Sequence, residues 1–271
     1  MITPIGLNNY THKNISPTFS SYNAKVYKDG KLAYRNHTEF FRQDLDWHHL
    51  TDYMSEKYKD ADEVNVVNHA CSAGYESWSL LLMLMKKHGE KAEKYLPIKA
   101  RDIDKNAIDF AKTGCLALCG DEYLDGILKC GKILNDNFKV VKKPRGPNVN
   151  VSNEYVMKCT TGLEKNIEFK QSDIFKDKNL INKENTVLFC RNFWPYLRSK
   201  KASELAFFLA QNMKPSSMLV IGEYDKTFGI DKLLEETGFK RTSVRYVYEA
   251  PDNFNKTKPV EFHMLRADLF A

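Results

Sequence analysis

The 271 residues of this chain include 42% hydrophobic and 28% charged residues, a balance that excludes a disordered or fibrous protein. The formal net charge is +6, and the lysines are scattered rather than gathered with aromatic residues, so we predict no nucleic-acid surface. The longest apolar run, Leu80 to Met85, is far shorter than the ~20 residues that span a bilayer, and we expect no membrane insertion.

The first 36 residues carry no apolar stretch behind basic residues, so they do not resemble a secretory signal. Six cysteines in such a chain are expected to be reduced thiols, and the expected location is the cytoplasm. Cys115, Cys119 and Cys130 have the alternative use of binding a metal. The paired spacing of zinc knuckles and a nearby histidine are both absent, so we predict no metal site.

Two kinds of segment precede the main pattern. Residues 24–35 alternate in polarity around the turn dipeptide Asp29-Gly30, which predicts a small β-hairpin. Residues 38–59 carry apolar side chains at near-helical spacing, which predicts one or two helices packed on a sheet. We therefore expect an N-terminal extension over residues 1–35 and one domain over residues 36–271.

Strands and helices then alternate regularly. The predicted strands are 64–67, 97–102, 167–174, 186–190 and 218–221, and the predicted helices are 76–88, 105–112 and 200–213. Such alternation indicates an α/β fold with a mainly parallel sheet and crossover helices.

Two regions depart from this alternation. The segment at about 115–165 is interpreted as an insert with a helical piece and a short hairpin. The strand-like runs 241–249 and 260–267 predict an antiparallel pair at the sheet edge.

Ligands of open α/β sheets bind where the strands end. Gly74, between the first strand and its helix, allows a ligand to approach the backbone closely. The second strand ends in Asp102-Ile103-Asp104, where an acidic residue can accept hydrogen bonds from ribose hydroxyls. Asp104 has the alternative role of capping the next helix.

The glycine-rich patterns G-x-G-x-x-G and G-x-x-x-x-G-K-[ST] are both absent from the chain. The sheet is therefore expected to hold a nucleoside cofactor without a diphosphate, with S-adenosylmethionine as the leading candidate. Its ribose would lie at the second strand, its adenine near residues 171–173 and its amino-acid part over the first turn.

The strand 186–190 leads into the sequence Cys190-Arg191-Asn192-Phe193-Trp194-Pro195-Tyr196. Polar residues at successive exit positions indicate a site, although they have the alternative role of fixing a turn under an aromatic lid.

Four separated motifs together resemble those of the CheR-type chemotaxis receptor methyltransferases. The family patterns N-x-T-x-F-F-R, G-E-E-x-x-S, D-I-D and C-R-N-x-x-x-Y are matched in order by Asn36 to Arg42, Gly74-Tyr75-Glu76 with Ser79, Asp102-Ile103-Asp104, and Cys190-Arg191-Asn192 with Tyr196. The resemblance implies a Rossmann-like class I methyltransferase with a mainly parallel seven-stranded sheet and an antiparallel C-terminal edge pair. It also implies S-adenosylmethionine as methyl donor, S-adenosylhomocysteine as product and a protein glutamate as acceptor.

The resemblance assigns roles at the matching positions. Glu76 is expected to hold the methionine ammonium, Asp102 the ribose, and Asp173 with Ile174 the adenine. The full set of implied cofactor-binding residues is Asn36, Thr38, Arg42, Gly74, Glu76, Asp102, Asp173, Ile174, Arg191 and Asn192. The implied catalytic residues are Arg42, Arg191 and Tyr196; for both arginines, a role as buried structural ion-pair partners stays open.

The chain departs from the family pattern at several positions. Tyr75 replaces the first Glu of the acidic pair, Ser77 replaces a Pro, and Gly222-Glu223-Tyr224 lacks the His of the family's G-H-S-E. A partner such as the cytoplasmic domain of a chemoreceptor is implied. Methylation of a small molecule or another protein, and non-catalytic binding of cofactor or partner, are the alternatives.

Overall fold

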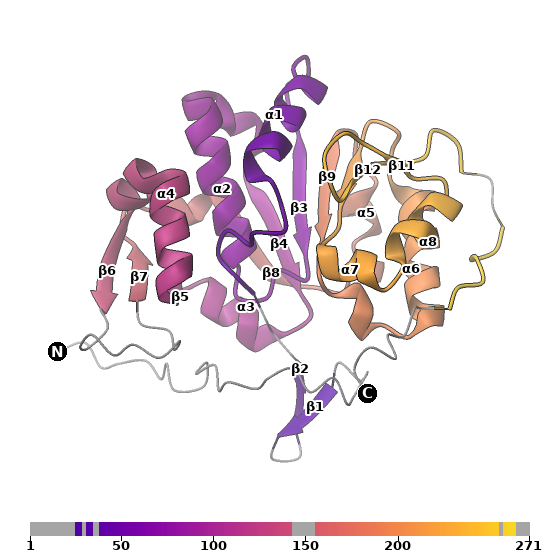
Figure 1. The fold of residues 1–271 in the computed structure, drawn as a ribbon, viewed down its shortest axis with the longest axis horizontal. Helices are drawn as coiled ribbons and strands as arrows, with labels where there is room; N and C mark the ends of the chain where they lie inside the picture. Colours follow the sequence, from indigo (N-terminus) through magenta and orange to yellow (C-terminus); the bar gives the residue numbers. More distant parts are fainter. Residues whose placement is uncertain (1–24, 29–30, 35–37, 143–154, 255–256, 264–271) are drawn as a thin grey trace.

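The structure is a computed structural model that describes residues 25–28, 31–34, 38–142, 155–254 and 257–263 (Figure 1). Its centre is a seven-stranded sheet with the order β11-β12-β10-β9-β3-β4-β8. The strands are β3 (Asn65–His69), β4 (Ile98–Asp102), β8 (Ile167–Gln171), β9 (Thr186–Cys190), β10 (Met218–Val220), β11 (Lys240–Arg241) and β12 (Val247–Glu249). The five strands from β10 to β8 are parallel, whereas β12 and β11 pair antiparallel at one edge. The predicted α/β fold is confirmed.

Helices cover both faces of this sheet (Figure 1). They are α1 (Trp47–Lys57), α2 (Tyr75–His88), α3 (Lys105–Ala111), α5 (Lys178–Ile181), α6 (Ser199–Asn212), α7 (Glu223–Thr227) and α8 (Ile230–Glu236), with the short 3-10 helices η2 (Gly89–Tyr95), η3 (Leu163–Asn166), η4 (Ile174–Lys176) and η5 (Trp194–Tyr196). Successive strand residues face opposite sides: Val66 belongs to one buried cluster and Val67 to the other. This two-sided burial explains why the central strands β9 and β10 are nearly continuous apolar runs.

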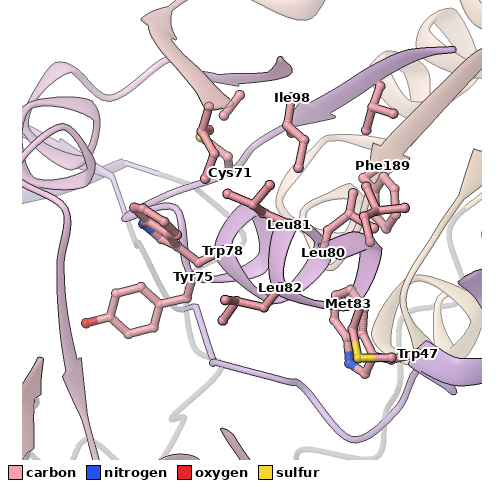
Figure 2. Close-up of a cluster of buried hydrophobic side chains, with 14 of the residues drawn as sticks. Trp47, Cys71, Tyr75, Trp78, Leu80, Leu81, Leu82, Met83, Ile98 and Phe189 are labelled. Atoms are coloured by element: carbon pink, nitrogen blue, oxygen red, sulfur yellow. The ribbon is translucent and has the colours of Figure 1, made fainter. Parts of the chain in front are cut away.

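The middle of helix α2, Leu80 to Leu84, is apolar and enclosed on all sides. Each residue from Leu80 to Leu84 is at most 1% exposed. Figure 2 shows Leu81 pointing toward Ile98 and Leu80 toward Phe189 of the sheet, and Met83 next to Trp47 of α1. A helix of this kind fixes the position of the turn that precedes it.

The insert forms a separate three-stranded antiparallel sheet with one long helix. It contains β5 (Cys115–Leu118), α4 (Gly120–Asn137), β6 (Phe138–Lys142) and β7 (Tyr155–Cys159), in the sheet order β5-β7-β6. The predicted N-terminal hairpin is present as β1 (Lys25–Lys28) and β2 (Lys31–Tyr34). The division of the chain at residue 35 stays a prediction.

The C-terminal edge corrects the sequence prediction. The antiparallel pair is β11 and β12, and both strands lie within or beside the single predicted run 241–249. A turn separates them, in which Val247 N–H bonds to the Val244 carbonyl and Tyr246 adopts a φ of 67°. Residues 260–263 form no strand, and 264–267 lie outside the described residues. Helices α7 and α8, which sequence analysis did not assign, have 5 and 7 residues, too short for a clear helical period.

Candidate active site

The turn between β3 and α2 has an unusual backbone. Ala70, Ser72 and Gly74 have φ values of 57°, 51° and 84°, all in the left-handed region. A Cβ at Gly74 would lie 2.6 Å from the Phe169 ring, so the position requires glycine for space as well as for conformation. Left-handed backbone at a non-glycine residue costs roughly 1–2 kcal/mol. Such strain gathers at functional sites.

Asp102, at the end of β4, closes this turn from the neighbouring strand. Its carboxylate accepts hydrogen bonds from Ser72 N–H (2.7 Å) and Asp104 N–H (2.8 Å) and is 6% exposed. Burial raises the pKa of Asp102, and the two N–H groups partly offset this effect. A carboxylate has about four acceptor positions, so Asp102 can accept further hydrogen bonds from a ligand.

Asp104 instead caps α3, with its side chain accepting from Asn106 N–H at 2.8 Å. The two aspartates therefore have different roles, and the capping role that sequence analysis left open for Asp104 is the one observed.

The end of β8 lies next to Asp102, because Ser172 N–H bonds to the Asp102 carbonyl at 2.8 Å. The half-buried Asp173 caps η4 by accepting from Phe175 N–H at 3.1 Å. Ile174 is 8% exposed and packs in the buried cluster on the α6 side of the sheet. The two predicted adenine residues thus border the same edge of the sheet as Asp102.

Arg191, just after β9, lies between two carboxylates. Its guanidinium donates to Asp44 at 2.6 Å and to Glu76, and its Nε donates to the Ile221 carbonyl at 3.3 Å. The side chain is 1% exposed, against 11% for Asp44 and 14% for Glu76. Burial acts to lower the pKa of Arg191, but Glu76 and Asp44 together raise it, so the guanidinium stays charged. Of the two roles considered for Arg191, this geometry favours a buried ion-pair partner.

Asn192 follows with a φ of 57°, and its side chain packs against Gly222, where a Cβ would lie 2.0 Å from Asn192 Oδ1. The Asn192 N–H donates to Asp225 of α7 at 2.7 Å. Tyr196, on η5, is half-buried. The loop after β9 therefore contacts the loop after β10 directly, through Asn192.

Residues 38–44 reach this site from the N-terminal side. Phe40 N–H donates to Glu122 of α4 at 2.9 Å, and Phe41 N–H donates to Ser79 of α2 at 2.8 Å. The half-buried Arg42 side chain is 19% exposed and lies 3.8 Å from Glu39. Thr38 is half-buried, and Asn36 lies outside the described residues.

Tyr75 and Glu76 point in different directions. The Tyr75 hydroxyl donates to the Ala117 carbonyl at 3.0 Å and accepts from the Ala117 N–H at 2.8 Å, both on strand β5 of the insert. In Figure 2 this hydroxyl points away from the side chains that face the sheet. The Tyr75 side chain thus ties the insert to the start of α2, while Glu76 supplies the carboxylate beside Arg191.

Sequence analysis missed two carboxylates, Asp44 and Asp225. Asp44 offers no motif, because its contact with Arg191 spans 147 positions. Asp225 offers one: it directly follows Gly222-Glu223-Tyr224, at the fourth position, where the pattern G-H-S-E also has an acidic residue.

The described residues show neither a metal cluster nor a membrane-spanning helix. No group of three or more His, Cys, Asp and Glu residues there is arranged to hold a metal. None of the helices in that part of the chain is long and apolar enough to cross a membrane.

The comparison with known families is decisive. The profile of the family described as "CheR methyltransferase, SAM binding domain" matches residues 36–123 and 138–242. The chain belongs to the CheR methyltransferase family. The matched profile is that of the family's S-adenosylmethionine-binding domain. The matched ranges include every candidate residue named above, and they leave out residues 124–137 of α4.

Among solved structures, the chain is similar to one titled "Crystal structure of DszA carbon methyltransferase". The identity is 10% and the TM-score 0.42, with 76% of this chain and 53% of that chain covered. The chain thus spans about half the length of that methyltransferase.

The residues of the CheR site fit the cofactor. Ser72 Oγ is buried in the strained turn and has no hydrogen-bond partner among the described residues, so it can bond to a ligand. The Glu76–Arg191–Asp44 group has two carboxylates for one guanidinium, which favours a cationic ligand. Asp102 retains acceptor capacity for hydroxyl groups.

Proposed function

We propose that this protein transfers the methyl group of S-adenosylmethionine to a glutamate carboxylate of another protein and so forms a methyl ester. Membership of the CheR family supports the reaction type. The observation that carries the proposal is that Asp102, Glu76 and Arg191 lie at the carboxyl ends of the adjacent strands β4, β3 and β9. Arg191 bonds directly to Glu76, and Asp102 closes the turn that precedes Glu76. A cytoplasmic location, and an acceptor such as the cytoplasmic domain of a chemoreceptor, belong to the same proposal.

The proposed reaction requires no general acid or base from the protein. When bound, S-adenosylmethionine supplies a methyl group on a sulfonium sulfur and leaves S-adenosylhomocysteine. A glutamate side chain has a pKa near 4.3, so at neutral pH it is already the ionised nucleophile and needs no general base. The residues of the site therefore contribute by aligning the acceptor oxygen and by excluding water.

Different residues of the site bind different parts of the cofactor. Asp102 accepts hydrogen bonds from the ribose hydroxyls, and Glu76 holds the methionine ammonium. Arg191 fixes Glu76 in place, because its guanidinium holds both Glu76 and Asp44. Adenine is bordered by Asp173 and Ile174. The remaining contacts are assigned to Asn36, Thr38, Gly74 and Asn192.

Arg42 and Tyr196 are the candidates for contact with the acceptor. Arg191 is 1% exposed and already holds two carboxylates, so it is poorly placed to receive a third. The Arg42 side chain is 19% exposed, and its 3.8 Å separation from Glu39 is too long for a hydrogen bond. We therefore assign the orientation of the incoming carboxylate to Arg42 and the alignment of the methyl group to Tyr196.

The test uses S-adenosylmethionine with a tritiated methyl group and a purified chemoreceptor cytoplasmic domain as acceptor. The expected product releases volatile tritium as methanol in mild base, and an acceptor with its glutamates changed to glutamine gives none. Arg42→Ala and Tyr196→Phe should each lower turnover by about tenfold or more, while the affinity for S-adenosylhomocysteine changes by less than about threefold.

The other outcomes are equally clear. Base-stable label would show methylation of nitrogen or carbon and would contradict ester formation. Tight cofactor binding without transfer to this acceptor would contradict the proposed acceptor class. Unchanged turnover in both variants would contradict the roles of Arg42 and Tyr196.

A further inference from the structure

Asp225 is a fully buried carboxylate that the proposed reaction does not use. It lies on α7, directly behind the loop that follows β9, and is 0% exposed. Its Oδ2 accepts from the N–H groups of Gly222 and Asn192, both at 2.7 Å, and its Oδ1 accepts from Trp194 N–H at 3.2 Å. One side chain thus binds three backbone donors.

These donors lie in the two segments that border the site. Asn192 and Trp194 belong to the loop after β9, where strand pairing has ended, and Gly222 follows β10. A buried N–H without an acceptor costs about 1–3 kcal/mol. The left-handed conformation of Asn192 and the packing of its side chain on Gly222 therefore depend on the acceptor that Asp225 supplies.

We propose that Asp225 is a positioning residue of the methyl-transfer site: its carboxylate joins the loops after β9 and β10 and so places Arg191 and Asn192 beside the cofactor. The inference rests on the proposed function, because it assumes that these loops border bound S-adenosylmethionine. It goes beyond that function by giving a role to a residue that would touch neither cofactor nor acceptor.

An amide at position 225 could not replace the carboxylate as acceptor for all three backbone N–H groups. Both oxygens of Asp225 are acceptors, whereas Asn has one acceptor oxygen and a donor NH2 group. Asp225→Asn would therefore present a donor to at least one of the three backbone N–H groups. Hydrogen bonds to an ionised acceptor are also roughly twice as strong as neutral ones.

The Asp225 carboxylate is mainly protonated at about pH 6 and mainly ionised at about pH 8. Arg191 attracts the negative charge, while burial raises the pKa of Asp225 to about 7. The Cys190 thiol, whose pKa burial raises well above its ordinary value, stays uncharged beside it. Glu223 and Lys226, on the same helix, are exposed.

The test is calorimetric titration of the full-length protein with S-adenosylhomocysteine at about pH 6 and pH 8. The variants are Asp225→Asn, Asp225→Glu and the control Asp231→Asn, which changes a 6% exposed carboxylate on α8 that pairs with Arg241. We expect wild type and Asp231→Asn to bind about threefold more tightly at pH 8, since charge-assisted hydrogen bonds are stronger. Asp225→Asn should bind about tenfold more weakly at pH 8 and show less pH dependence. Asp225→Glu, which keeps a carboxylate, should recover part of the loss.

Each result decides a specific point. Wild-type affinity and pH dependence in a folded Asp225→Asn would overturn the positioning role and leave the cofactor site intact. No binding by wild type would overturn the cofactor site and this inference with it. If Asp225→Asn does not fold, hydrogen exchange of the backbone amides in the wild-type protein tests the proposal instead. The Asn192, Trp194 and Gly222 amides should exchange about 100-fold or more slowly relative to exposed amides; unprotected amides would overturn the proposal.

Discussion

The loops after β3 and after β9 border the same site but are held in different ways. The first depends mainly on its own backbone, with one side-chain hydrogen bond from a neighbouring strand: Ala70, Ser72 and Gly74 are left-handed, Ser72 N–H donates to Asp102, and Gly74 fills a space too small for a side chain. The second is fixed by side chains from distant segments, Asp44 to Arg191 and Asp225 to the loop N–H groups.

Because the two loops are held differently, each is sensitive to a different kind of substitution. A loop held by backbone conformation fails when a side chain is added to its glycine. A loop held by buried carboxylates fails when a carboxylate or its partner side chain is removed, and its stability depends on pH. Substitutions in the two loops should therefore have different effects on stability, cofactor binding and pH dependence.

The largest effect is expected from Arg191→Ala. It leaves the Asp44 and Glu76 carboxylates buried without their counter-ion, which costs about 3–5 kcal/mol of unfolding free energy. Arg241→Ala is the matched control, since Arg241 also pairs with two carboxylates but is 52% exposed. The control should lose less than about 1 kcal/mol. Urea denaturation measures both, and equal losses would contradict the buried ion group.

Gly74→Ala should break the first loop. The left-handed conformation and the contact with the Phe169 ring together cost about 2–3 kcal/mol. Gly131→Ala on α4 is the control, because its Cβ would make only an ordinary contact, 3.7 Å from Ile127. That control should leave stability unchanged or raise it by up to about 1 kcal/mol. Thermal denaturation compares the two, and a stable Gly74→Ala would disprove the backbone argument.

Gly222→Ala should disturb the second loop with a smaller loss of stability. Its backbone is not left-handed, so the added Cβ meets only the Asn192 side chain, and the cost is about 1 kcal/mol. The affinity for S-adenosylhomocysteine should fall by about tenfold if Asn192 contacts the cofactor. In an Asn192→Ala background the same change should have little effect. An additive double variant would show that the two residues act separately.

The smallest effect is a pH dependence of stability. Burial raises the pKa of Asp225 to about 7, so the folded state binds this proton more tightly than the unfolded state. Its contribution to stability is therefore present at low pH and is lost as pH rises through 7. Between about pH 6 and pH 8, wild type should lose more unfolding free energy than Asp225→Asn. Parallel urea profiles of the two proteins would contradict the shifted pKa.

The centre of the sheet was predictable from sequence because β9 and β10 are buried on both faces. The run Thr186 to Cys190 coincides with β9, and Gly89 ends α2 as expected. The edge at β11 and β12 was not predictable, because a turn of ordinary residues divides one strand-like run.

Sequence motifs identify candidate site residues at the ends of strands, as with Asp102 and Arg191. Asp44 and Asp225 act through contacts across 147 and 33 positions, and such pairings arise only in the folded chain.

The central claim is that S-adenosylmethionine binds at the edge formed by β3, β4 and β9. Calorimetric titration with S-adenosylhomocysteine tests it most directly, using Asp102→Ala and Asp104→Ala as a matched pair. Asp102→Ala should weaken binding by about tenfold or more, because it removes the charged acceptor for the ribose. Asp104→Ala should cost about 1 kcal/mol of stability as a lost helix cap but leave the affinity unchanged. Equal affinities in wild type and Asp102→Ala would contradict the account.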